Sequence, residues 1–204
     1  MKGSHIFLFS AMCWLMLAHG NKIFRFGPCR ISMSMNEIRA GFAAIKANIV
    51  SIAGGSGGVG KPFLSGSGDH PALTTASLPA QQSRDPIRTV SILSHPHSLH
   101  RIKSSEKCCI IHHLFNFYVD KVFKYCTTED SYVNRKISSI ANSFLSIKRN
   151  LAQCHNQNMC KCGQESTEKF KQILANYKGL NVTSAAMKSL GELDILLDWM
   201  EKSR

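Results

Sequence analysis

The stretch that decides the fold is Cys108-Cys-Ile-Ile-His-His-Leu-Phe-Asn-Phe-Tyr-Val-Asp-Lys-Val-Phe-Lys124. It predicts an amphipathic helix, because its large apolar side chains recur every three or four residues and therefore share one face. These side chains are Ile111, Leu114, Phe115, Tyr118, Val122 and Phe123, and Cys126 extends the same face. The adjacent cysteines Cys108 and Cys109 cannot bridge each other without strain, so each is expected to pair elsewhere.

Further segments on both sides show the same helical spacing. The first begins at Ser34-Met-Asn-Glu37, which is typical of a capping box, and is expected to run for about 15 residues. The apolar faces of these segments are Ile38, Phe42, Ile45 and Ile49; Ile137, Ile140, Ala141, Phe144 and Leu151; Phe170, Ile173, Leu174 and Tyr177; and Met187, Leu190, Leu193, Leu197 and Met200. Because no convincing strand and no internal repeat interrupts them, the pattern predicts an all-α bundle.

Residues 1–20 have the pattern of a secretory signal peptide. Lys2 supplies a positive start, Ile6 to Ala18 is apolar apart from one serine, and Ala18-His-Gly20 offers small residues for cleavage. The apolar run is shorter than the roughly 20 residues that a membrane span needs. We therefore expect a secreted, extracellular protein whose helical domain covers residues 21–204.

In an oxidising compartment, cysteines of this kind form disulfides rather than reactive sites. The relevant set is Cys29, Cys108, Cys109, Cys154, Cys160 and Cys162, and spacing alone does not choose among the connectivities. Zinc is the alternative, with His112, His113 and His155 nearby, but the Cys-Cys and Cys-x-Cys spacings do not match the usual C-x2-C pairs. Cys126 is left over, either as a buried free thiol or, less favoured, as an intermolecular pair.

Composition narrows the function classes. The formal net charge of +12 suggests adhesion to acidic surfaces such as heparan sulphate. Nucleic acid is disfavoured because no aromatic stacking platform accompanies the basic residues. Gly55 to Lys61 has the glycines and lysine of a phosphate-binding loop, but Pro62 follows where a hydroxyl is needed, so we interpret it as coincidence. With no acid–base or nucleophilic constellation, the chain is predicted not to be an enzyme and to need no cofactor.

Five runs, taken together, resemble the interleukin-20 subfamily of interleukin-10 class cytokines. They are Asn36-Glu-Ile-Arg-x-Gly-Phe42, Cys108 to Lys124, Arg135 to Leu145, Cys154-x5-Cys160-x-Cys162-Gly163, and Leu190-Gly-Glu-Leu-Asp-Ile-Leu-Leu197. The resemblance implies a monomeric six-helix bundle. It also implies the disulfides Cys29–Cys154, Cys108–Cys160 and Cys109–Cys162.

The same resemblance implies a ligand that bridges two class II cytokine receptor chains and triggers JAK–STAT signalling in epithelial and immune cells. The implied partners are the interleukin-20 receptor alpha and beta chains, with the interleukin-22 receptor alpha chain as a further candidate. Asn36, Arg39 and Lys46 lie off the apolar face of the first helix and are the expected contact residues, although ordinary solvated surface is the alternative. Asn181-Val-Thr183 is an N-glycosylation sequon, or else only a helix cap. The alternative function is a basic secreted heparin-binding or antimicrobial protein without a dedicated receptor.

Residues 50–82 depart from the family pattern. From Ser51 to Gln82 the chain is rich in Gly, Ser, Pro and Ala and holds seven of its 14 glycines, which predicts a disordered loop. Ile49 and Gln82-Ser-Arg84 would join naturally if Val50 to Gln81 were absent. The hypothesis is that this stretch is a retained intron read in frame, or a gene-model artefact.

Overall fold

A computed structural model describes residues 21–53, 91–93 and 99–203. The predicted signal peptide, the phosphate-loop-like run and nearly all of the glycine-rich stretch lie outside the described residues. The elements, in chain order, are β1 (Lys22–Phe26), β2 (Cys29–Met33), α2 (Met35–Ala43), α3 (Lys46–Ala53), the 3₁₀ turn η1 (Ser104–Glu106), α6 (Lys107–Phe117), the π-helical turn η2 (Tyr118–Val122), α7 (Phe123–Tyr125), α8 (Ser131–Asn156), α9 (Gln164–Lys178), α10 (Val182–Gly191) and α11 (Leu193–Lys202).

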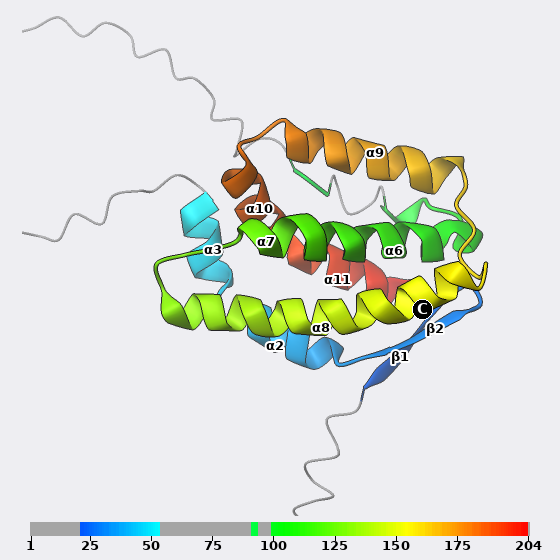
Figure 1. Cartoon of the computed structure of the whole chain (residues 1–204), viewed down its shortest axis with the longest axis horizontal. Coiled ribbons are helices and arrows are strands. Elements are labelled where there is room, and N and C mark those ends of the chain that lie inside the picture. The colour runs from blue at the N-terminus through cyan, green and yellow to red at the C-terminus, as the bar shows by residue number, and fades with distance from the viewer. Residues whose placement is uncertain (1–20, 54–90, 94–98, 204) are drawn as a thin grey trace, which may run out of the picture.

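The helices form a bundle around the segment that opened the sequence argument (Figure 1). Helices α6, η2 and α7 run along the middle, α8 packs against α6 on one side, and α9 packs against it on the other. Helix α2 lies against α8 on the face away from α9, and α10 contacts α3 and α9. The all-α prediction is confirmed, since strands contribute only one small hairpin within the part of the chain that the structure describes.

The hairpin of β1 and β2 corrects the prediction that no strand occurs. Its strands pair antiparallel from Lys22 opposite Met33 to Phe26 opposite Cys29, which leaves Gly27 and Pro28 as a two-residue turn. Gly27 has φ of 61°, and the proline ring cannot take a positive φ, so the turn fits type II′. Phe24, Phe26, Ile31 and Met33 alternate with exposed residues and are buried, so the hairpin covers the core with one face.

Three of the predicted helices are broken, and only the last break coincides with a glycine, Gly191. The first divides into α2 and α3, with a tight bond from the Ile45 N–H to the Phe42 carbonyl between them. The central one passes through the π turn η2, and the last divides into α10 and α11 at Glu192. Ser34 does occupy the N-cap position of α2, but its side chain makes no capping hydrogen bond, so the predicted capping box is not formed.

The core contains the apolar faces that the helical spacing predicts. Phe115 of α6 stacks on Phe144 of α8 with ring centroids 4.5 Å apart, and Trp199 of α11 is fully buried. The Tyr118 hydroxyl donates a 2.8 Å hydrogen bond to the Ser189 carbonyl of α10, which gives this buried phenol its partner. Ile92 and Leu93, the short segment after the glycine-rich stretch, are also fully buried.

Candidate functional site

Three disulfides brace one end of the bundle. They join Cys29 to Cys154, Cys108 to Cys160 and Cys109 to Cys162, which are the pairs that the resemblance implies. The first ties the hairpin to the end of α8. The other two tie the start of α6 to the connection between α8 and α9. Since each bridge closes a loop of more than fifty residues, each is expected to stabilise the fold by about 2–4 kcal/mol.

The zinc alternative is disfavoured by the same bridges. The donor atoms of Cys109, His113 and Cys162 lie within 4.8 Å of one another, as do the sulfurs of Cys29, Cys108 and Cys160. In both groups the cysteines are disulfide-bonded, so they offer no thiolate to a metal. The leftover Cys126 is buried and unpaired, and its burial raises the pKa of the thiol to about 12.

A histidine stack lies beside the bridges. His112 of α6 and His155 of α8 stack with ring centroids 4.6 Å apart, and His113 stacks on Phe170 of α9. The Nδ1 atoms of His112 and His155 are buried without a hydrogen-bond partner. Burial first, and then the neighbouring charges of His155, His113 and Lys148, lowers the pKa of His112 to about 4. His112 is therefore neutral at physiological pH, and its ring packs against that of His155 between α6 and α8.

A buried carboxylate holds α9 to the start of α6. The Glu106 side chain accepts two 2.9 Å hydrogen bonds from Ser166, one from the backbone N–H and one from the hydroxyl. The backbone bond from Ser166 and its hydroxyl bond outweigh desolvation, so the pKa of Glu106 is lowered. Gly163, the residue before α9, lies so close to this carboxylate that a β-carbon at that position would collide with it.

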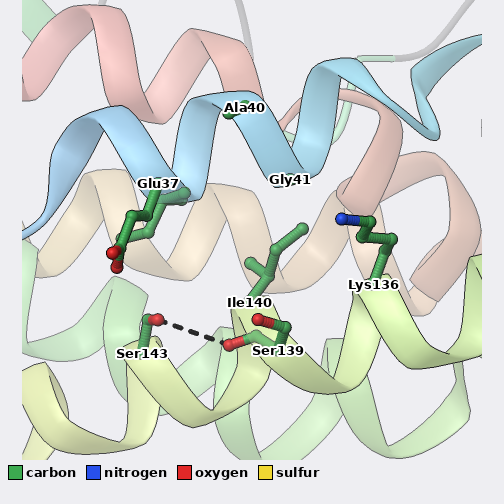
Figure 2. A pocket seen from close by; sticks show the side chains of 8 residues that line it. Glu37, Ala40, Gly41, Lys136, Ser139, Ile140 and Ser143 are labelled. Atoms are coloured by element: carbon green, nitrogen blue, oxygen red, sulfur yellow. Dashed lines mark hydrogen bonds between the residues drawn. The ribbon is translucent and has the colours of Figure 1, made fainter. Parts of the chain in front are cut away.

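A polar pocket of about 400 Å³ lies between α2 and α8. It is lined by Glu37, Ile38, Ala40, Gly41, Lys136, Ser139, Ile140 and Ser143. Figure 2 shows Glu37 and Lys136 on opposite sides of Ile140, with Ser139 and Ser143 on α8 facing α2. Within the described ranges neither charge makes an ion pair, so the pocket offers an anion, a cation and hydroxyls for recognition.

Gly41 allows α2 and α8 to pack closely at this pocket. A β-carbon on Gly41 would lie 3.3 Å from Cγ1 of Ile140, which is tighter than ordinary packing. The absence of a side chain at Gly41 therefore lets α2 approach α8 and leaves the flanking Glu37 and Lys136 at the mouth of a shallow hollow.

Of the three contact residues expected from the sequence, Asn36 and Arg39 lie on α2, and Lys46 is the first residue of α3. Asn36 is exposed. The Arg39 guanidinium binds Asp198 at 2.6 Å and Glu201 at 2.9 Å, and the Lys46 ammonium binds Asp194 at 2.6 Å. The structure thus places both cations, Arg39 and Lys46, in ion pairs with α11.

Glu192 has a role that the sequence did not reveal. As an acidic residue of the last predicted helical segment, Glu192 is expected from the sequence to lie on a solvated helix face or in a local ion pair. Instead, its carboxylate accepts bonds from the backbone N–H groups of Ile92 and Leu93 and from the Ser91 hydroxyl, at 2.9 to 3.1 Å. It also lies 3.7 Å from the Lys188 ammonium, so the ion-pair interpretation is correct in part. No sequence signal marks the backbone contacts, because their donors are distant in the chain.

The α2–α8 pocket was also missed from the sequence. Lys136, Ser139 and Ser143 share the polar face of α8 at helical spacing, so their common orientation could have been inferred. What the sequence could not supply is that this polar face meets the side of α2 that carries Glu37 and Gly41.

The chain has clear relatives of known type. It is 48% identical to interleukin-20 of Mus musculus over 121 residues, which are 59% of this chain and 69% of that protein. It is 46% identical to interleukin-19 of Homo sapiens over 124 residues, or 61% and 70% of the two chains. The crystal structure of human interleukin-19 superposes with a TM-score of 0.61 at 35% identity, covering 83% of this chain and 88% of that one. No protein-family model matches.

A helical bundle with this bridge framework and these relatives is a cytokine, not an enzyme. None of the described helices has both the length and the apolarity that crossing a bilayer requires. The chain belongs to the interleukin-19/20/24 subfamily of the interleukin-10 cytokines.

Proposed function

We propose that this protein is a secreted ligand that binds two class II cytokine receptor chains at once, of the interleukin-20 receptor alpha and beta type, and so activates JAK–STAT signalling. The observation that carries the proposal is the 48% identity to mouse interleukin-20 across a preserved helical framework. Secretion is supported by the leader-like residues 1–20 and by three disulfides, which persist in oxidising compartments. The interleukin-22 receptor alpha chain is the further candidate partner.

The proposed mechanism needs no chemical step. A ligand that holds two receptor chains on one membrane raises the effective concentration of their intracellular tails relative to each other. Such a ligand needs two surfaces whose relative position is fixed. The bridges and the shared core supply this rigidity, because they lock the hairpin, α6, α8 and α9 together at one end.

We place one receptor contact on α2, α3 and the adjoining pocket. Asn36 is exposed there, and Glu37 and Lys136 present charges that no described side chain neutralises. Arg39 and Lys46 are already paired with α11, but surface ion pairs contribute at most about 1 kcal/mol, so receptor carboxylates can exchange with them.

Two measurements test the proposal. One is binding of the refolded protein to the paired receptor ectodomains, and the other is STAT phosphorylation in keratinocytes. We expect Lys136→Glu to weaken binding about tenfold or more, as loss of a central contact does. Lys161→Glu, which makes the same charge change at an exposed site between α8 and α9, is the matched control and should bind normally. STAT activation in cells that lack these receptor chains would contradict the proposal.

One observation favours the second candidate, a basic protein that binds heparan sulphate or other acidic surfaces without a receptor. Arg25 and Arg30 lie directly opposite each other on the exposed face of the hairpin, an arrangement that like charges disfavour unless an anion compensates them. Elution from heparin with salt tests this candidate. The double variant Arg25→Ser, Arg30→Ser should elute at a lower salt concentration than the natural chain, whereas its binding to the receptor chains should be unchanged.

A separate test concerns whether the glycine-rich stretch belongs to the functional protein. We propose that Val50 to Gln81 is a retained intron or a gene-model artefact, on the grounds of its composition and of its position between two family-like segments. Sequencing of the transcript should show, as the main species, a product that joins the codon of Ile49 to that of Gln82. If every transcript carries the stretch, the idea is wrong.

A further inference from the structure

A second, apolar pocket lies on the other side of the bundle, far from α2. Its volume is about 270 Å³, and it is lined by Lys121, Tyr125, Leu174, Tyr177, Lys178, Leu180 and Val182. Helix α9, which supplies several of these residues, lies on the opposite side of α6 and α7 from α2 (Figure 1). Tyr125 and Val182 are 40% and 46% exposed, so two large apolar side chains face solvent beside the pocket.

The sequon occupies the rim of this pocket. Asn181 stands between Leu180 and Val182, both of which line the pocket, and it is exposed. Its Oδ1 accepts a 3.0 Å hydrogen bond from the Thr183 N–H and so caps α10. The cap uses only the amide oxygen. The amide nitrogen Nδ2, which is the atom that carries an N-glycan, takes part in no hydrogen bond to the described residues.

We propose that Asn181 carries an N-linked glycan whose first N-acetylglucosamine packs into this pocket, against Tyr125 and Val182. The proposal rests on the proposed function, because a sequon meets the glycosylating machinery only in a secreted chain. The chemistry of the pocket fits a sugar: the apolar face of a pyranose ring can cover an aromatic side chain, and the ammonium groups of Lys121 and Lys178 can donate to its hydroxyl and acetamide oxygens.

The modification is a group transfer whose donor is a lipid-linked oligosaccharide pyrophosphate. Nδ2 of Asn181 attacks C1 of the first sugar, the C1–N bond forms, and the bond from C1 to the pyrophosphate oxygen breaks. The amide gives up one proton and the lipid pyrophosphate leaves. The Oδ1 cap on α10 survives the reaction, since that oxygen forms no new covalent bond.

The location of the glycan has a consequence for recognition. It would cover the α7–α9–α10 face and leave the α2–α8 pocket open, because α9 lies on the opposite side of α6 from α8 and α2 (Figure 1). A receptor contact on α2 would therefore tolerate the glycan, whereas a contact that extends over α3 would lie nearer to it, because α3 packs against α10.

The first experiment measures occupancy in protein secreted from animal cells. We expect intact mass to show one glycan on the natural chain and on Thr183→Ser, which keeps the sequon, and none on Thr183→Ala or Asn181→Asp. Both of the latter variants keep an oxygen that caps α10, so they separate loss of the glycan from loss of the cap. A secreted chain without a glycan at Asn181 would overturn the proposal while leaving the receptor proposal intact.

The second experiment tests the packing. Protein bearing oligomannose glycans is trimmed by an endoglycosidase that leaves only the first sugar. We expect trimmed protein to keep the melting temperature of the full glycoform and Thr183→Ala to melt roughly 2–4 °C lower. Tyr125→Ala should lower the melting temperature of the glycoform more than it lowers that of the Thr183→Ala protein, because contacting groups are not additive. Equal shifts in the two backgrounds would show that the sugar does not contact the pocket.

Discussion

At the scale of single residues, the surroundings of several titratable side chains, rather than their residue type, determine their chemical behaviour. His112 and Cys126 are reactive residue types that burial makes inert at neutral pH. Glu106, which is buried, and Glu192, which is half-buried, are charged residues whose carboxylates accept hydrogen bonds from backbone N–H groups. The burial of Cys126 follows from its place on the predicted apolar face, whereas the roles of Glu106 and Glu192 could not be inferred locally, since their bonding partners lie tens of residues away.

The His112 stack predicts a loss of stability in acid. The unfolded histidine binds its proton near its ordinary pKa of 6.5, and the folded one only near about 4. Between these values the unfolded state holds more protons, so the free energy of unfolding falls as the pH falls through that window. Thermal melts from pH 7 to pH 4 should show this slope in the natural chain and a smaller one in His112→Gln.

The exposed His100→Gln is the control for this measurement and should keep the slope of the natural chain. If His112→Gln and the natural chain lose stability in parallel across the window, His112 does not supply the pH dependence.

Cys126 is predicted to be unreactive in the native protein. Its thiol is buried, and burial raises its pKa to about 12, so almost no thiolate exists at pH 8. A maleimide should label the chain only after denaturation, and Cys126→Ala should abolish that labelling. Rapid labelling of the folded protein, or a covalent dimer that Cys126→Ala removes, would instead favour intermolecular pairing.

At the scale of elements, the helices could be predicted and the points where they break could not. The faces built on Phe115 and Phe144 follow from helical spacing, which the sequence displays over many turns. The break at Ile45 carries no glycine or proline, so tertiary packing decides it. The hairpin did have a signal, the alternation around Gly27-Pro28, but strands of five residues repeat the pattern too few times to stand out.

The start of α9 offers a test of one element's anchoring. Gly163→Ala should displace the Glu106 carboxylate from Ser166, because the new β-carbon would occupy the same space. Leaving buried polar groups unpaired costs about 1–3 kcal/mol, and we expect denaturant melts to show a loss of that size.

Gly179→Ala at the other end of α9 is the matched control. Its β-carbon would meet only the Asn176 and Ala175 carbonyls, at 3.5 and 3.6 Å, so stability should change little. Equal losses for the two variants would mean that Glu106 is not what makes Gly163 necessary.

At the scale of the whole molecule, the bridges and the core make the fold indifferent to the length of the glycine-rich stretch. Deleting Val50 to Gln81 removes none of the bridged cysteines and none of the core residues that the structure describes, although it takes the last four residues, Val50 to Ala53, from α3. Loop-closure entropy grows only with the logarithm of length. The free energy of unfolding of the shortened chain, measured in urea, should therefore lie within about 1 kcal/mol of that of the full chain. A larger loss would mean that the stretch has a structural role.

The junction at Gly191 and Glu192 is where the two sides of that stretch come together. A β-carbon on Gly191 would lie 3.7 Å from Ile49 and 3.9 Å from Val50, while Glu192 holds the backbone of Ile92 and Leu93. The residues on the two sides of the stretch are thus held next to each other. A foreign domain could therefore replace the stretch without moving either side. A fluorescent protein or an affinity module whose own termini are adjacent could be inserted in place of the glycine-rich stretch. Such a fusion would label cells that bind the cytokine.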